Sequence, residues 1–178
     1  MTKGTPLEPL SEMMAKAEAN GTMMYYALAR LAKEQGMEEV SKTFIEAANQ
    51  EAVHAGFYAT LNGKVPQDFW ELVRGVMAAE YRGETTIKGM ADKFRAAGLA
   101  KAADEMEIFA KHERHHGEMM EGLLKKYNPE ALDVAGKEIY VFGVCGFEYI
   151  GDLAVEPEDY ICPVCGQPKK VFKLKALP

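Results

Sequence analysis

The sequence predicts a mainly α-helical protein, in which a four-helix bundle is followed by a small β domain that a metal ion stabilises. Two observations lead to this fold class. Four long segments with helical periodicity fill residues 1–134. Residues 135–178 instead carry short β-type runs and all three cysteines of the chain. The two ranges are expected to be separate domains.

The four helices are each bounded by turn signals. Asn62-Gly63 closes the second helix, Gly98 stops the third, and Asn128-Pro129 follows the fourth. Pro66 and Asp68 suit the first turn of the third helix. The expected helices cover about residues 9–36, 38–61, 66–97 and 99–127.

The chain changes character after the fourth helix. Residues 130–136 have the composition of a linker, and β-type runs follow at 138–142 and 147–150. The motif Cys162-Pro-Val-Cys165-Gly166 lies further on, and with Cys145 it makes an odd, clustered set that suits metal ligation better than disulfides. A domain of about 40 residues is too small to be stable on its core alone, so a bound metal is expected.

One pattern occurs twice, a lone Glu that is followed 33 residues later by Glu-x-x-His. Residues at i and i+3 share a helix face, so each Glu-x-x-His can offer a carboxylate and an imidazole to one ion. With two further helices that each give one Glu, this is the ligand set of a di-iron or di-manganese bundle. The candidate ligands are Glu18, Glu51, His54, Glu80, Glu113 and His116.

A single Glu-x-x-His is more often a solvated pair than a metal site. Two copies with matched upstream Glu residues are much harder to obtain by accident. Four Glu side chains at the centre of a bundle are also very costly unless they are paired or bound to metal. The doubled pattern therefore favours a metal centre.

Composition narrows the function classes. Hydrophobic residues make up 48% of the chain and charged residues 27%, as in soluble globular proteins. A net charge of −6 without a basic run argues against nucleic acid as a partner. The N-terminal segment lacks an apolar signal region and no later run could span a bilayer. A cytoplasmic protein with no membrane partner is expected.

Several runs follow one another in a specific order. They are Glu18 with Tyr25, Gln50-Glu51-Ala-Val-His54, Glu80, Glu113-Arg-His-His116, Ile139-Tyr-Val-Phe-Gly-Val-Cys145-Gly-Phe147 and Cys162-Pro-Val-Cys165-Gly166. In this order they resemble rubrerythrin, in which a ferritin-like di-iron bundle precedes a rubredoxin domain. The resemblance covers nearly the whole chain.

The resemblance implies a peroxidase. It places the six carboxylate and imidazole ligands on two irons, with Glu51 and Glu113 as bridges. Tyr25 would orient a carboxylate through its hydroxyl, or else be a core aromatic residue. Hydrogen peroxide would be reduced to water, with electrons from a redox donor protein or reductase passing through a C-terminal thiolate-bound iron. A functional homodimer is implied as well.

Two positions depart from the family pattern. Rubrerythrins carry a further Glu three residues after the first Glu of the third helix, but this chain has Gly83 there and Glu84 one residue later. Glu84 would reach the metal only if a π-bulge shifts the helix; otherwise it is an exposed helix residue. In the first Cys-x-x-Cys pair Phe142 replaces a cysteine, which leaves an incomplete site for iron or zinc at Cys145, Cys162 and Cys165, or a metal-free lobe.

The link between the second and third helices is short. In a ferritin-like bundle these helices run parallel, and the chain must return over roughly 33 Å to bring Glu80 level with Glu51. About six residues reach at most roughly 20 Å. Either the bundle is a simple up-down-up-down one, or two chains exchange helix pairs. We favour the second arrangement, a domain-swapped dimer, because it keeps the ligand set.

Two other functions remain open on the sequence. A ferritin-like ferroxidase or iron-handling protein would use the same ligands, although it has no evident use for the cysteine module. A non-enzymatic metal or redox sensor would need a surface for a partner, and the sequence indicates none beyond the dimer.

Overall fold

The computed structural model describes residues 1–63, 65 and 68–175, which form two compact units. The first unit is Met1–Val65 and the second is Pro66–Pro178. The predicted division between residues 134 and 135 followed composition rather than packing, and that domain boundary stays a prediction. Within the described residues, no helix combines the length and the apolar character that crossing a membrane requires.

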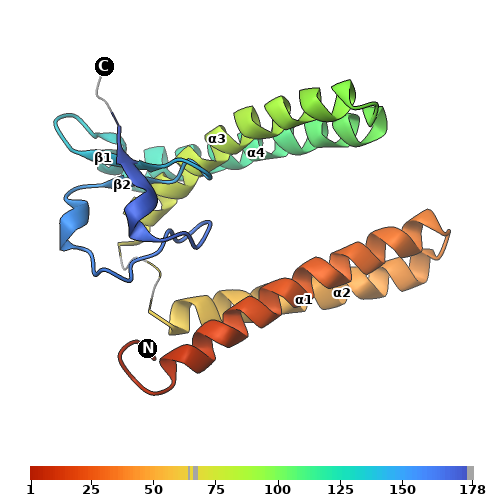
Figure 1. Cartoon of the computed structure of the whole chain (residues 1–178), viewed down its shortest axis with the longest axis horizontal. Coiled ribbons are helices and arrows are strands. Elements are labelled where there is room, and N and C mark those ends of the chain that lie inside the picture. Colours follow the sequence, from red (N-terminus) through yellow and green to blue (C-terminus); the bar gives the residue numbers. More distant parts are fainter. Residues whose placement is uncertain (64, 66–67, 176–178) are drawn as a thin grey trace. The chain divides into compact units, whose positions relative to one another are not determined.

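The first unit is a hairpin of two antiparallel helices, α1 (Glu8–Glu34) and α2 (Glu38–Leu61), which Figure 1 draws in red to orange. Its buried helix residues are all small, whereas apolar side chains such as Met13, Val53 and Phe57 are exposed. Because so little apolar volume is enclosed, the hairpin has no substantial core of its own. The buried helix residues are Ser11, Ala29, Ala32, Ser41 and Ala48.

The second unit begins with another hairpin, α3 (Phe69–Ala96) and α4 (Ala100–Tyr127). Asp68 caps α3, because its carboxylate accepts a hydrogen bond of 2.9 Å from the backbone N–H of Glu71. Trp70 stacks on Tyr127 with ring centroids 6.3 Å apart and so joins the two helices. The four helices lie where the sequence predicts them; Pro66 lies outside the described residues.

A small β region completes the second unit. Its sheet has the order β2-β1-β3, with β1 (Ile139–Phe142) paired antiparallel to β2 (Glu148–Ile150) and to β3 (Phe172–Leu174). Short 3-10 helices complete the region at Leu153–Val155 (η2) and Lys169–Val171 (η3). The sequence predicted the first two strands but not β3, whose three residues are too few to show a period.

The β region packs tightly on α3. A Cβ atom added at Gly75 would lie 2.3 Å from the ring of Phe147, so only glycine permits this approach. Beside it the guanidinium of the buried Arg74 donates to a carboxylate oxygen and to the backbone carbonyl of Glu148, both at 2.9 Å. These contacts hold α3 and the sheet together as parts of one unit.

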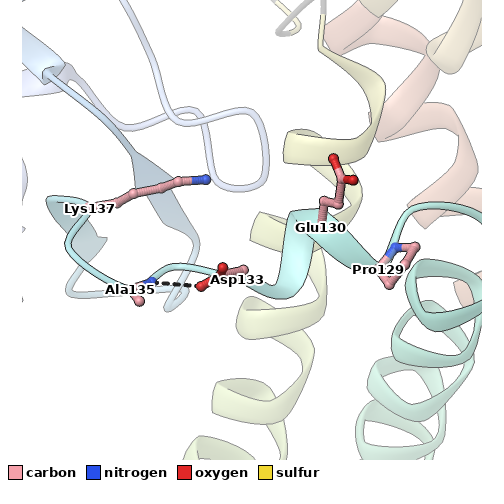
Figure 2. A pocket seen from close by; sticks show the side chains of 5 residues that line it. All are labelled: Pro129, Glu130, Asp133, Ala135 and Lys137. Carbon is pink, nitrogen blue, oxygen red and sulfur yellow. Dashed lines mark hydrogen bonds between the residues drawn. The ribbon is translucent and has the colours of Figure 1, made fainter.

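The segment between α4 and β1 contains a short 3-10 helix. Pro129–Leu132 forms a 3-10 helix, η1, within what the sequence predicted as a linker. After it the backbone N–H of Ala135 donates to Asp133 at 3.1 Å. The segment and Lys137 line a hollow of about 490 Å³. Figure 2 shows the five lining side chains, Pro129, Glu130, Asp133, Ala135 and Lys137.

Candidate metal centre

The first hairpin brings one copy of the repeated motif together. Glu18 comes from α1, and Glu51 and His54 come from α2. Nδ1 of His54 lies 3.6 Å from Oε2 of Glu18 and 3.5 Å from Oε2 of Glu51. One donor atom from each residue lies within 4.8 Å of the others, the spacing of a group that could hold an ion. We call this group half-site 1.

The second hairpin repeats the arrangement as half-site 2. Glu80 comes from α3, and Glu113 and His116 come from α4. Nδ1 of His116 lies 3.3 Å from Oε2 of Glu80, and the three donor atoms again lie within 4.8 Å of one another. The structure therefore brings the six residues that the sequence predicts as ligands together in two groups of three.

Two glycines lie beside ligand carboxylates, and the sequence analysis missed that one of them, Gly83, makes room for its carboxylate. Gly21 and Gly83 each follow the first Glu of their copy by three residues, so the shared offset was the signal that could have found them. A Cβ atom added at Gly83 would lie 2.5 Å from Oε2 of Glu113. At Gly21 it would lie 3.5 Å from Cδ of Glu51, an ordinary contact.

The charges in both half-sites favour a cation. The pKa of Glu18 is raised because its carboxyl shares a hydrogen bond with Glu51, and further by desolvation and by the charge of Glu51. Burial raises the pKa of Glu113, and the neighbouring charge of Glu80 raises it further. Like charges at this spacing oppose each other unless a proton or a metal ion lies between them. Hard oxygen donors with one imidazole fit ferrous iron or manganese.

Glu84 belongs to neither of the two half-sites. α3 is α-helical from Phe69 to Ala96, without the π-bulge that would have turned Glu84 toward the ligands. The carboxylate of Glu84 accepts from Lys88 and lies 3.6 Å from Arg114, and Lys88 is the main reason that its pKa is lowered. In this arrangement Glu84 pairs with cations of the protein. Its service as a seventh ligand stays a prediction.

Tyr25 is a half-buried residue whose ring stacks on Phe44 at 6.1 Å. Among the described residues its hydroxyl makes no hydrogen bond to a ligand carboxylate. This packing corresponds to the core-aromatic alternative, and the carboxylate-orienting role stays a prediction.

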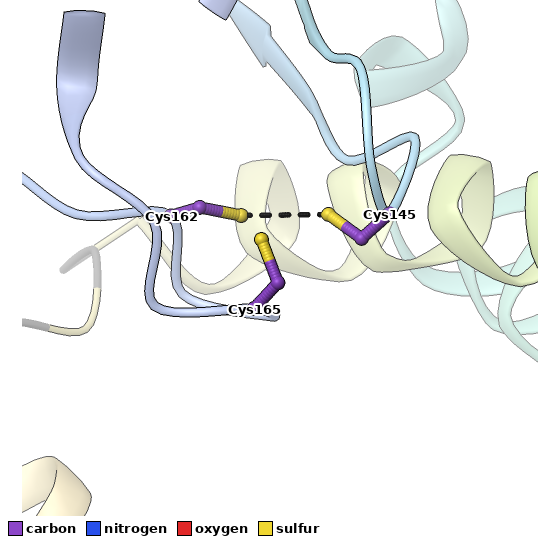
Figure 3. Close-up of side chains that lie close together, drawn as sticks. All are labelled: Cys145, Cys162 and Cys165. Atoms are coloured by element: carbon purple, nitrogen blue, oxygen red, sulfur yellow. Dashed lines mark hydrogen bonds between the residues drawn. The ribbon is translucent and has the colours of Figure 1, made fainter. Parts of the chain in front are cut away.

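The third group of possible ligands is in the β region. The Sγ atoms of Cys145, Cys162 and Cys165 lie within 4.8 Å of one another, and those of Cys145 and Cys162 are 3.6 Å apart (Figure 3). All three are free cysteines. Burial raises the pKa of the thiols of Cys145 and Cys162, so a bound metal ion rather than solvent would have to displace their protons.

One cavity of about 190 Å³ touches both half-site 2 and the cysteine group within the second unit. Glu80, Glu113 and Cys145 contribute to its wall. Sequence reasoning missed this cavity, because residues of α3, α4 and the two cysteine loops form it only after folding. The remaining lining residues are Ala79, Gly83, Thr86, Ile87, Val144 and Val164.

Helices with paired Glu and Glu-x-x-His ligands and an added thiol cluster define a carboxylate-histidine metal protein. Comparisons with known proteins show to which family of carboxylate-histidine metal proteins the chain belongs. The family model described as rubrerythrin matches residues 12–73. The chain is 30% identical to reverse rubrerythrin-1 of Clostridium acetobutylicum over 133 residues, covering 71% of this chain and 72% of that protein. It belongs to the rubrerythrin family.

Two further likenesses were found. An uncharacterised protein of Methanocaldococcus jannaschii is 30% identical over 127 residues, covering 71% of this chain and 90% of that protein. A solved structure of nigerythrin in a mixed-valence state is 23% identical, with a TM-score of 0.31 over 98% of this chain and 88% of that one. Family membership confirms the predicted fold class, a ferritin-like helical protein with a rubredoxin-like C-terminal region. It also supports a di-iron oxidoreductase.

Proposed function

We propose that this protein reduces hydrogen peroxide to water at a dinuclear iron centre formed by half-sites 1 and 2. The observation that carries the proposal is the doubled ligand group itself. Each half-site offers two carboxylates and one imidazole. The two half-sites together therefore offer four negatively charged carboxylates and two neutral imidazoles. Four carboxylates balance the charge of two divalent cations, so the donor set fits two ferrous ions. When bound, adjacent ferrous ions supply both electrons that cleavage of the O–O bond needs.

The side chains of the chain have distinct tasks in this proposal. His54 and His116 would each hold one ion, and Glu51 and Glu113 would be the ligands shared by the two ions. Glu18 and Glu80 would each complete the ligands of one ion. The cavity beside Glu80 and Glu113 is where we place the substrate, because its 190 Å³ exceeds the roughly 30 Å³ that one water molecule occupies and accommodates a molecule with two oxygen atoms.

We further propose that each centre combines half-site 1 of one chain with half-site 2 of a second chain, in a swapped homodimer. The link from Leu61 to Phe69 is short for the parallel connection that a bundle within one chain needs. The first hairpin also exposes large apolar side chains, among them Met13, Val53 and Phe57, that a second hairpin would cover.

Electrons must reach the centre after each turnover. A rubredoxin-type iron takes four thiolates, and this chain offers three, with a buried Phe142 at the fourth position. The residues do not fit that iron, so we propose that a redox donor protein or reductase delivers electrons without it. Passage through a C-terminal iron stays a prediction from the resemblance.

Turnover of peroxide and dioxygen by iron-loaded protein tests the proposal. We expect peroxide to oxidise the reduced centre faster than dioxygen, and Glu113→Gln to lower peroxide turnover at least about 100-fold, since even groups that only support metal ligands are worth about 10–100-fold. Glu118→Gln is the matched control, because Glu118 is an exposed residue of the same helix that pairs with Arg114. Iron oxidation by dioxygen with mineral formation and no peroxide turnover would instead establish an iron-handling protein.

A further inference from the structure

The cysteine group has three donors and an apolar fourth corner. The sulfur atoms of Cys145, Cys162 and Cys165 converge in Figure 3, and within the described part of the chain no His, Asp or Glu joins them. A second Cys-x-x-Cys pair would place its first thiol at position 142, which is a phenylalanine.

Phe142 is built into the core rather than displaced from it. Its side chain is 1% exposed and shares one buried cluster with Cys162, Phe147 and Phe172. The ring packs edge-on against Phe172 with centroids 5.4 Å apart. The backbone around it keeps its turn, since the N–H of Gly146 donates to the carbonyl of Phe142 at 2.8 Å. The position from which a fourth thiol would come is therefore occupied by a buried hydrocarbon ring.

This donor set disfavours the usual metals of such a site. Thiolate-bound iron of the rubredoxin type takes four thiolates, and zinc would need a water molecule as its fourth ligand here. Three thiolates beside an apolar wall instead suit a soft ion that is satisfied with three sulfur ligands, and copper(I) is the soft cation that thiolates select. Copper(II) prefers tetragonal sites of nitrogen and oxygen, so this pocket would hold the reduced ion without cycling it.

We propose that Cys145, Cys162 and Cys165 form a three-coordinate site for copper(I), closed by Phe142, in place of a four-thiolate iron site. This inference stands apart from the peroxide chemistry, because no ligand is shared with the two half-sites.

Metal-free protein of all 178 residues, titrated with copper(I) under anaerobic conditions against the chelator bicinchoninate, tests the proposal. We expect one tightly bound copper(I) per chain and an X-ray absorption spectrum with a shell of three sulfur atoms. The half-sites contain no sulfur, so a sulfur shell excludes them, and a cysteine substitution distinguishes the three cysteines from the eleven methionines of the chain. Cys165→Ser is expected to weaken copper(I) binding at least about 100-fold.

Substitution of the closing residue gives the complementary test. Phe142→Cys restores a fourth thiol, and its iron-loaded form is expected to gain the thiolate-to-iron charge-transfer absorption that the iron-loaded parent lacks. Phe142→Leu keeps an apolar corner and is expected to keep copper(I) binding without that absorption. If Phe142→Cys does not fold, the copper(I) proposal is still tested by three proteins: the parent, Phe142→Leu and Cys165→Ser. Four-coordinate iron with charge-transfer bands in the parent protein, or copper(I) binding that Cys165→Ser leaves unchanged, would overturn the proposal.

Discussion

Replacing Gly83 by alanine should separate the stability of the fold from its capacity to bind metal. The added Cβ would lie 2.5 Å from Oε2 of Glu113, whereas ordinary contacts begin near 3.5 Å. The carboxylate must therefore move by about 1 Å. Metal–ligand distances tolerate only about 0.2 Å, so half-site 2 cannot bind an ion without rearranging.

The fold itself should tolerate this change, because the atom that must move is the free end of a flexible side chain. Alanine inside a helix is more stable than glycine by roughly 0.5–1 kcal/mol. We expect Gly83→Ala to keep or raise the unfolding temperature of the metal-free protein while metal affinity falls about 10–100-fold. Calorimetric titration with manganese(II) and thermal unfolding followed by circular dichroism measure the two effects.

Gly21→Ala is the matched control at the equivalent position of the other hairpin. Its Cβ would make an ordinary contact of 3.5 Å with Glu51, so the same helix stabilisation is expected with metal binding unchanged. The reasoning fails if Gly83→Ala binds metal as the parent does, or if the two variants lose affinity equally.

Two other predictions concern charge. The raised pKa values of Glu18 and Glu113 mean that the folded metal-free protein binds protons more tightly than the unfolded chain, so the free energy of unfolding should fall as pH rises from about 4.5 through the raised values. Denaturant titrations across this range should show the slope for metal-free protein and lose it on metal loading; equal slopes would contradict the electrostatic account. Arg74→Ala should destabilise the second unit by about 1–3 kcal/mol, because it removes two hydrogen bonds to Glu148 while Lys175 stays 2.8 Å from the carboxylate of Glu148. Arg114→Ala, at an exposed pair, should cost no more than about 1 kcal/mol in the same chemical unfolding assay.

The parts of the account that the sequence predicted are those that depend on local spacing. The helix ends and the six ligands follow from periodicity and from the Glu-x-x-His repeat, and the structure places each ligand beside the partners in its own hairpin. Strand β3 was not predicted, because the three residues Phe172–Leu174 are too few to show the alternation of apolar and polar side chains that marks a strand.

What the sequence did not reveal depends on contacts between distant segments. Arg74 looks like an ordinary helix cation until the sheet buries it against Glu148. The clearance at Gly83 matters only because α4 brings Glu113 next to it, whereas in the sequence Gly83 marked only the absence of a further Glu. The sequence left Glu84 either as a metal ligand or as an exposed helix residue, and in the structure its carboxylate lies beside Lys88 and Arg114.

Subunit complementation tests most directly whether two chains build each peroxide-reducing centre. Glu51→Gln disables half-site 1 and Glu113→Gln disables half-site 2, so each variant alone should be inactive. After the two are unfolded together, refolded and loaded with iron, a swapped heterodimer contains one centre with all six ligands. Random pairing then predicts roughly one quarter of the parent's peroxide turnover. Turnover no greater than that of the two separate variants, with parent protein recovering fully from the same treatment, would contradict a centre shared between chains.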